Sequence, residues 1–311
     1  MLKRLNYTNV LCFSYGKLNN KEAEISKKIA HDLGFEWYFV EHEKEFEKLL
    51  EQEEYKQYEK FAGQGISLPH IQDFYAVKKL KEKNILKKGD IFIPGHSYDF
   101  LAGSHLLEKF FDLNYKLNDQ NLVNEIIKKH YSLWGNKKNK KIIEVQLYKN
   151  YIKDNKLNSI TSYIEILDSF NLKERQAKFI VNSVKVYEYF GYDWRVPLWD
   201  LELIKYWEEI SFKNKLNRKL YFEYTEQTEI LRELLKYNII ETLKGKRIRK
   251  IINKIPLLKN NIKKIIKIYN YGKDSNNFDK LINKKKYIKG VLKGQENINS
   301  FLVLEYLQQL I

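Results

Sequence analysis

The first hundred residues alternate between strand-like and helix-like hydrophobic patterns. Short apolar runs typical of buried strands occupy residues 10–15, 35–40 and 91–93. Amphipathic segments typical of helices occupy residues 22–33, 43–61 and 69–83. Strands that alternate with helices predict parallel β–α–β units with right-handed crossovers.

The strand pattern fades after about residue 106, and a helical period continues. We expect helices at residues 121–131, 142–152, 160–170, 174–190, 201–210 and 224–237, followed by a basic, apolar stretch at 244–270. The predicted fold class is therefore α/β: a partial doubly wound parallel sheet followed by a mostly helical C-terminal region. We expect a nucleotide-binding-like region at residues 1–110 and a helical region at 111–311.

Composition supports a folded protein, because 43% of the residues are hydrophobic and 14% are aromatic. The single cysteine, Cys12, excludes an internal disulfide and a cysteine-based zinc site, which suits a reducing compartment. No apolar run reaches the roughly 18 residues of a membrane span. The first residues lack the apolar segment of a signal peptide. We therefore expect a cytoplasmic protein without a transmembrane segment.

The net charge of +16 raises the question of nucleic-acid binding. However, only seven of the 56 basic residues are arginine, and Lys, Asn, Ile and Tyr are abundant along the whole chain. We favour a compositional bias and expect no specific nucleic-acid partner. The basic stripe at 244–267 leaves two interpretations open: a face that packs on the core, or a surface for a membrane or nucleic acid.

Candidate chemistry is concentrated after the third predicted strand. The run ends at Pro94-Gly95, which is typical of a strand whose carboxyl end opens into a ligand-binding loop. Gly95 would let a ligand approach the backbone closely, and Asp99 would hold Mg²⁺. A Ser97 nucleophile elbow is disfavoured because Asp99 stands where that motif needs glycine. A metal site on His96 and His105 lacks further clustered ligands, and a purely structural loop remains an alternative.

A second stretch places Arg195 and Asp200 on either side of Pro197, as a structural pair or as site residues. Together, three segments carry a resemblance: C-F-S-Y-G (residues 12–16), P-G-H-S-Y-D-F-L-A-G-S-H (94–105) and D-W-R-V-P-L-W-D (193–200). The second partly matches S-G-x-G-x-D-E-x-x-x-G-Y and the third matches E-x-R-x-P-F-L-D. Over residues 1–240 the chain resembles the synthetase domain of the asparagine synthetase family, which has the PP-loop ATP pyrophosphatase fold.

The resemblance implies an ATP-dependent amidotransferase. Members activate a carboxylate such as that of aspartate as an acyl-adenylate, and ammonia from a glutaminase domain then displaces AMP. By position, Tyr15, Gly95 and Ser97 would line the ATP site. Asp99 would bind Mg²⁺ and, with His96, form the catalytic pair. The residues leave open whether the acceptor is aspartate or a sugar acid.

Several family features differ or are missing. The phosphate-binding loop S-G-G-x-D-S and the glutaminase domain do not occur in this sequence, while His96 and Phe100 replace acidic residues of the middle motif. The active-site lysine has one candidate, Lys219. We therefore expect an incomplete chain with weak or no activity alone, whose partner would be a separately encoded N-terminal segment carrying the phosphate loop and glutaminase. The alternative from another class is a non-catalytic fragment or scaffold that binds a protein partner.

Overall fold

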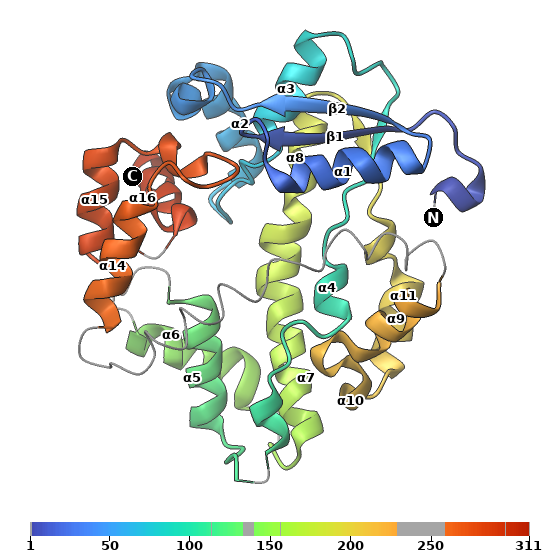
Figure 1. The fold of residues 1–311 in the computed structure, drawn as a ribbon. Helices are drawn as coiled ribbons and strands as arrows, with labels where there is room; N and C mark the ends of the chain where they lie inside the picture. The colour runs from blue at the N-terminus through green and yellow to red at the C-terminus, as the bar shows by residue number, and fades with distance from the viewer. Residues whose placement is uncertain are drawn as a thin grey trace. The chain divides into compact units, whose positions relative to one another are not determined.

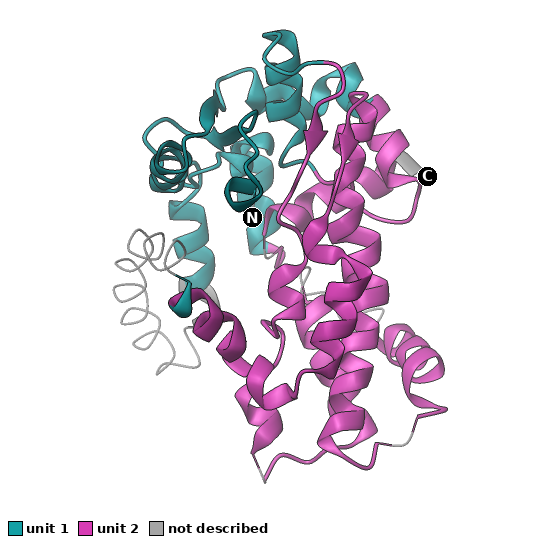
Figure 2. Ribbon diagram, turned by 90° about the vertical axis from the view of Figure 1, so that its right-hand side faces the viewer, with its two compact units in different colours: residues 1–56, 71–87, 227–292 teal, residues 57–70, 88–226, 293–311 magenta. Residues whose placement is uncertain are grey.

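The computed structural model describes residues 2–112, 114–132, 140–155, 157–228, 259–295 and 297–310 (Figure 1). Two compact units interleave along the chain (Figure 2). Unit 1 comprises residues 1–56, 71–87 and 227–292, and unit 2 comprises residues 57–70, 88–226 and 293–311. The predicted division into residues 1–110 and 111–311 stays a prediction.

Unit 1 begins, after the short η1 (Leu2–Leu5), with the predicted β–α–β unit. Its elements are β1 (Leu11–Gly16), α1 (Lys21–Asp32) and β2 (Glu36–Glu41). The strands are parallel, with Leu11 opposite Glu36. Asn20 accepts a hydrogen bond from the Ala23 backbone N–H at 2.8 Å, which satisfies a free donor at the start of α1. Gly34, at φ +72°, follows the helix in the left-handed conformation that glycine tolerates.

An aromatic cluster forms much of the rest of the unit 1 core. The His42 ring stacks on Phe46 at 3.8 Å between centroids, and Tyr75 and Phe278 meet both rings edge-on. The contributing and flanking elements are η2 (Phe46–Glu51), α3 (Phe74–Glu82), α14 (Lys259–Tyr269), η9 (Phe278–Leu281) and α15 (Lys284–Leu292). Of the basic stretch 244–270, residues 244–258 lie outside the described residues.

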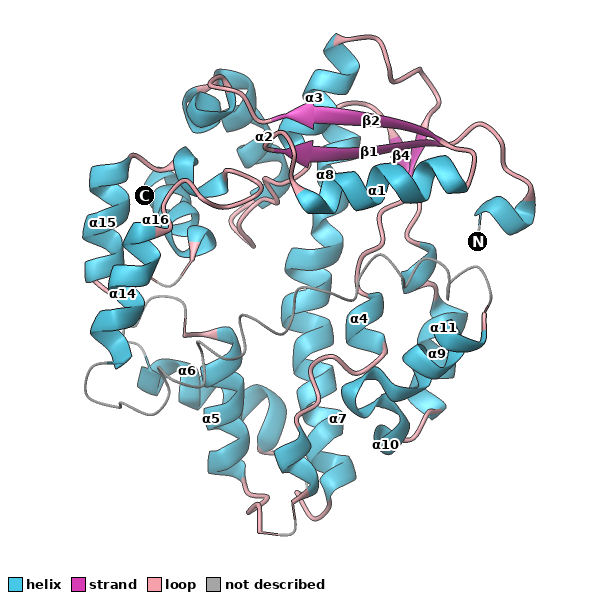
Figure 3. Cartoon of the chain, viewed as in Figure 1, coloured by secondary structure: helices cyan, strands magenta, loops and turns pink. Residues whose placement is uncertain are grey.

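Unit 2 contains the third predicted strand, β3 (Ile91–Phe92), but its partner is β4 (Asp193–Trp194). The described residues thus form two separate two-stranded parallel sheets instead of one sheet. The protein is α/β, rich in helix, with small parallel sheets (Figure 3). The predicted α/β class is confirmed at this level, and the doubly wound sheet stays a prediction. A strand of two residues such as β4 is too short to show the alternating hydrophobic pattern from which its pairing with β3 could have been predicted.

Helices make up most of unit 2. They are α4 (Tyr98–Leu101), η3 (Glu108–Phe111), α5 (Asp119–His130), α6 (Lys140–Leu147), η4 (Tyr148–Ile152), α7 (Ile160–Phe170), η5 (Asn171–Ile180), η6 (Val181–Val184), α8 (Lys185–Tyr189), η7 (Pro197–Trp199), α9 (Leu201–Glu209), α10 (Phe212–Lys215), η8 (Leu216–Arg218), α11 (Lys219–Gln227) and α16 (Ile298–Leu310); α2 (Glu53–Gly63) contains the boundary at residues 56 and 57. The segments η4 and η5 are π-helices. The predicted helix at 224–237 coincides with the end of α11, and its residues 229–237 lie outside the described residues.

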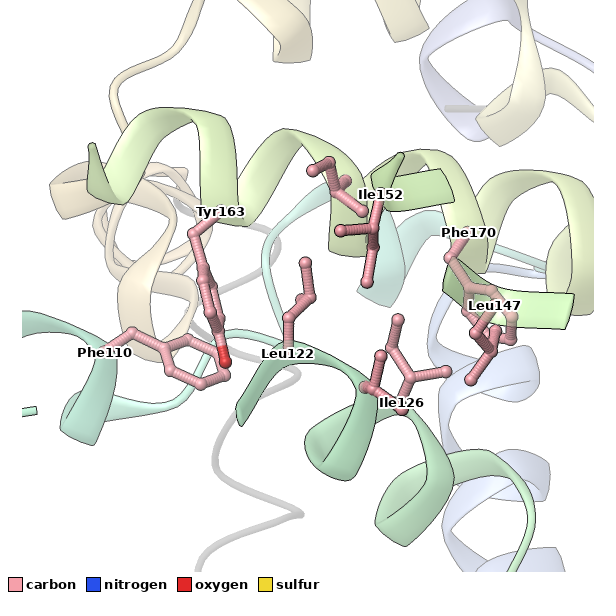
Figure 4. Packing of buried hydrophobic residues seen from close by; sticks show 9 residues of the cluster. Phe110, Leu122, Ile126, Leu147, Ile152, Tyr163 and Phe170 are labelled. Atoms are coloured by element: carbon pink, nitrogen blue, oxygen red, sulfur yellow. The ribbon is translucent and has the colours of Figure 1, made fainter. Parts of the chain in front are cut away.

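Residues 160–189 form one continuous helical run, where the sequence predicted two helices. Side chains of this run pack with α5, α6 and η4 into a cluster of fully buried residues (Figure 4). Leu122 and Ile126 on α5 are completely buried there, as is Tyr163 on α7. Among the described residues, no helix has both the length and the apolar character needed to cross a membrane.

We expect Leu122→Ala to lower the free energy of unfolding of unit 2 by about 2–5 kcal/mol, because it leaves a cavity in this closed cluster. Urea denaturation followed by circular dichroism measures the change. Leu201→Ala is the matched control, since Leu201 is 62% exposed and should change stability by less than about 0.5 kcal/mol. Equal losses in both variants would contradict the assignment of Leu122 to the core.

Candidate functional site

Ser97 lies in the loop between β3 and α4 and anchors it. Its φ is +68°, its side chain is buried, and its hydroxyl donates to Gln176 Oε1 at 2.9 Å. Gln176 in turn donates through Nε2 to Asn171 Oδ1 at 3.1 Å. Both amides belong to η5, so this buried chain ties the predicted site loop to the long helical run. The Ser97 hydroxyl is satisfied inside the protein.

His96 is held by the same helical run. Its Nδ1 lies 2.9 Å from Ser183 Oγ, and that hydroxyl donates its proton to the Ile180 carbonyl at 2.6 Å. Because the hydroxyl has only one proton to give, Nδ1 of His96 must carry the hydrogen of the shared bond. The ring orientation of His96 is thereby fixed by a side chain that is 1% exposed.

Gly95 and Asp99 differ from their neighbours in being exposed. A Cβ at Gly95 would meet no atom within 4 Å, so backbone there is open to a ligand. Asp99 lies in the first turn of α4, and its Oδ2 accepts a hydrogen bond from Ser104 Oγ at 3.1 Å. Both positions are accessible to a ligand, and their roles in nucleotide and Mg²⁺ binding stay predictions.

Tyr15 belongs to unit 1, whereas the other four predicted site residues belong to unit 2. Its hydroxyl donates to Asp73 Oδ1 at 2.8 Å, and its ring stacks on His42. Burial, with a further contribution from the Asp73 carboxylate, raises the pKa of the Tyr15 phenol. The tyrosine is therefore neutral and integrated into the aromatic cluster of unit 1.

A group of charged side chains that sequence reasoning did not assemble lies around His105 in unit 2. His105 Nε2 contacts the Asp168 carboxylate, and Lys129 Nζ donates to the His105 carbonyl at 3.2 Å. His105 is 8% exposed, and its Nδ1 has no partner among the described residues. The members, which we call the His105 cluster, are Asp99, His105, Lys129, His130, Asp168, Arg175 and Lys215.

The pKa shifts in the cluster show which charges act on its members. Burial and then the positive charge of Arg175 lower the pKa of Lys129, while Asp168 and Asp99 oppose this. Burial also lowers the pKa of Lys215, which is 5% exposed. The pKa of His130 falls to about 4 because of burial, Arg175, Lys129 and His105. Arg175, Lys129 and His105 all disfavour protonation of His130, so the surroundings of His130 are electropositive.

Such an arrangement suits the binding of an anion. Cations that lie close together attract a carboxylate or phosphate group, and a buried one such as Lys215 attracts it most strongly. No group of three or more His, Cys, Asp or Glu side chains in the described part of the chain is arranged to hold a metal ion. Mg²⁺ usually combines one or two protein carboxylates with phosphate oxygens and water, so it needs no such group of protein ligands.

The other predicted positions have local roles. Lys219 is exposed, and its Nζ lies 3.8 Å from Glu223 Oε1 along α11. The lysine that is buried in the described part of the chain is Lys215, the last residue of α10. Asp200 accepts from the Glu202 N–H at 2.9 Å and caps α9, and Arg195 donates to the Trp194 carbonyl. The spacing of charged residues in the sequence gives no signal for the His105 cluster, because its members come from separate segments.

We expect His130 to make folding of unit 2 less favourable in acid. Its folded pKa of about 4 lies below the ordinary value of 6.5, so the unfolded chain binds its proton first as the pH falls. The contribution of neutral His130 to the free energy of unfolding is fully present above about pH 6.5 and is lost progressively towards about pH 4. Between about pH 7 and pH 5 the free energy of unfolding should fall by about 2 kcal/mol for this reason. Urea denaturation of wild type and His130→Gln at both pH values measures it. Parallel pH dependence in the two proteins would contradict the burial of a neutral His130.

No protein-family model, curated protein or solved structure matches this chain. The resemblance to the asparagine synthetase family therefore rests on the motif residues themselves.

Proposed function

We propose that this chain is the synthetase part of an asparagine-synthetase-like, ATP-dependent amidotransferase of the PP-loop ATP pyrophosphatase type, which binds its anionic reactants at the His105 cluster. One observation carries the proposal. Lys129 and Lys215 lie near the His105–Asp168 pair, and Arg175 lies near Lys129, in the same unit as the loop that bears Gly95 and Asp99. Both signs of charge that an adenylation site needs are therefore available within unit 2.

The cations match the reactants. ATP, pyrophosphate and the acceptor carboxylate are all anionic, and partly buried ammonium groups attract them more strongly than exposed ones. Bound ATP supplies the adenylyl group that activates a carboxylate, and Mg²⁺ neutralises the phosphates. Lys129 and Lys215 would stabilise the negative charge of the leaving pyrophosphate. Asp99, exposed beside them, would hold Mg²⁺.

Neighbouring residues orient these groups. Gly95 leaves room for the ligand, and Ser97 holds the loop through Gln176. Nδ1–H of His96 is engaged by Ser183, which fixes the imidazole for a role toward the substrate. Tyr15 enters the proposal only through its place in the motif, as a residue of the nucleotide site. A cytoplasmic location and a separately encoded partner carrying the phosphate loop and glutaminase complete the proposal, with aspartate as the family's carboxylate substrate.

We expect Lys129→Gln to weaken binding of Mg²⁺–ATP and Mg²⁺–pyrophosphate by roughly tenfold or more, because a hydrogen bond to a charged group contributes about 1.5–3 kcal/mol. Isothermal titration calorimetry measures both ligands. Lys128→Gln is the control, since the neighbouring Lys128 is exposed on the same helix and outside the cluster. Binding of neither ligand by the wild type, or equal weakening by both variants, would refute the proposed anion site.

We also expect Gly95→Ala to leave stability unchanged while it weakens Mg²⁺–ATP binding. A Cβ at this position meets no protein atom within 4 Å, so a methyl group costs the folded chain little. The same methyl group would obstruct a ligand that approaches the backbone. Thermal unfolding and calorimetry on one preparation separate the two effects. Unchanged affinity would remove Gly95 from the nucleotide site.

A further inference from the structure

Two cavities in unit 2 meet at the π-helix η4, away from the predicted motifs. Each has a volume of about 360 Å³, and both are lined by Asn150 and Tyr151. We call them together the η4 groove. The first cavity has an apolar and aromatic wall that includes Tyr131, Leu147 and Phe170. The second is lined mainly by hydroxyl, amide and charged side chains: Asn155, Ser162, Glu165, Ser169 and Lys173.

The π-helical segments of the chain border this groove. Asn150 and Tyr151 come from η4, while Lys173, Glu174 and Lys178 come from η5. The Tyr151 hydroxyl donates to Glu174 Oε1 at 2.8 Å and links the two segments. π-Helices are rare, and they occur frequently at functional sites. Two of them facing one groove is the observation that points to a ligand.

The charges in the groove are balanced. Lys178 Nζ lies 2.5 Å from Glu174 Oε2 in an i, i+4 pair. Burial opposes ionisation of Glu174, but the hydrogen bonds from Lys178 and Tyr151 outweigh it and lower its pKa. Glu165 and Lys173 in the second cavity add one charge of each sign. The charged side chains that line the two cavities therefore sum to zero, which gives a charged ligand no net attraction.

Other ligand classes fit the lining less well. A wholly apolar ligand would cover the amides of Gln146 and Asn150 without bonding to them. A nucleobase prefers to lie between parallel aromatic faces. Here the rings of Tyr131 and Tyr151 are inclined at 54° and 70° to Phe170, so these rings provide no such slot.

We propose that the η4 groove binds a neutral, polyhydroxylated ligand, a short oligosaccharide that places one ring in each cavity. The carbon–hydrogen face of a sugar ring packs on a single aromatic side chain, while planar amides and hydroxyls bond to its hydroxyl groups. The cavity volumes fall in the lower part of the range of about 300–1,000 Å³ for ligand pockets. The proposal uses different residues from the His105 cluster and does not depend on the amidotransferase activity.

Saturation-transfer NMR with the full chain and a panel of neutral disaccharides (cellobiose, maltose and N,N′-diacetylchitobiose) tests it. We expect transfer to at least one disaccharide, and a dissociation constant raised roughly tenfold in Asn150→Ala. Lys149→Ala is the control, because Lys149 is exposed on η4 and lines neither cavity. It should leave the dissociation constant within about twofold of the wild type.

Three results would overturn the proposal: no transfer to any disaccharide, binding unaffected by Asn150→Ala, or preferential Asn150-dependent binding of adenosine or aspartate. Thermal unfolding of Asn150→Ala shows whether the variant remains folded. If it does not, Tyr151→Phe replaces it, since this change removes one hydroxyl and retains the ring. Lys129→Gln should bind the disaccharide normally, which separates a failure here from a failure of the amidotransferase proposal.

Discussion

The hydrogen bond from Ser97 to Gln176 is the constraint on which the candidate site depends. A serine at φ +68° costs about 1–2 kcal/mol relative to ordinary backbone, and the two buried polar groups would cost more if they were left unpaired. Together they fix the loop after β3 on η5. From that fixed point, α4 and the turn at Gly103 lead the chain to His105, which meets Asp168 on the same helical run. Both ends of the connection are thus anchored on residues 160–189.

Gly103 also allows two backbone segments of unit 2 to approach each other closely. Its φ is +93°, and a Cβ there would lie 2.4 Å from the Lys215 carbonyl oxygen. The backbone around Lys215 can therefore approach only because residue 103 lacks a side chain. Lys215 is buried at this contact, and the attraction of Asp168 and Glu208 offsets part of the cost of removing its ammonium from water. Gly103, which the sequence analysis placed in the second motif segment, therefore makes room for the backbone of Lys215.

Much of the local structure could be predicted from sequence, and the reasons are visible in particular elements. The helix α7 begins at the predicted residue, because Ser159 and Ser162 form a capping box before a strong apolar period. The β1–α1–β2 unit was equally clear. The pairing of β3 with β4 was not, since two residues show no period. The π-helix η5 was not predicted. Its turns contain more residues than those of an α-helix, so the α-helical period of 3.6 residues is interrupted there and the sequence reads as two helices. The His105 cluster depends on tertiary packing, which no local pattern encodes.

The two sheets also differ at the edge where parallel strands usually offer a ligand site. In unit 1, the end of β1 is covered by the chain itself: Lys17 N–H donates to the Ser275 carbonyl, and His42 Nδ1 lies 2.6 Å from the Asn276 carbonyl. A Cβ at Gly16 would lie 2.7 Å from the Ser275 oxygen. In unit 2, the end of β3 leads to an exposed Gly95 with open space around it. Ligands of open α/β sheets bind beyond the carboxyl ends of the strands, and of these two strand ends only that of β3 is open. Because Lys129 and the buried Lys215 lie in that same unit, the open strand end and the positive charge both favour unit 2 as the location of an anionic ligand.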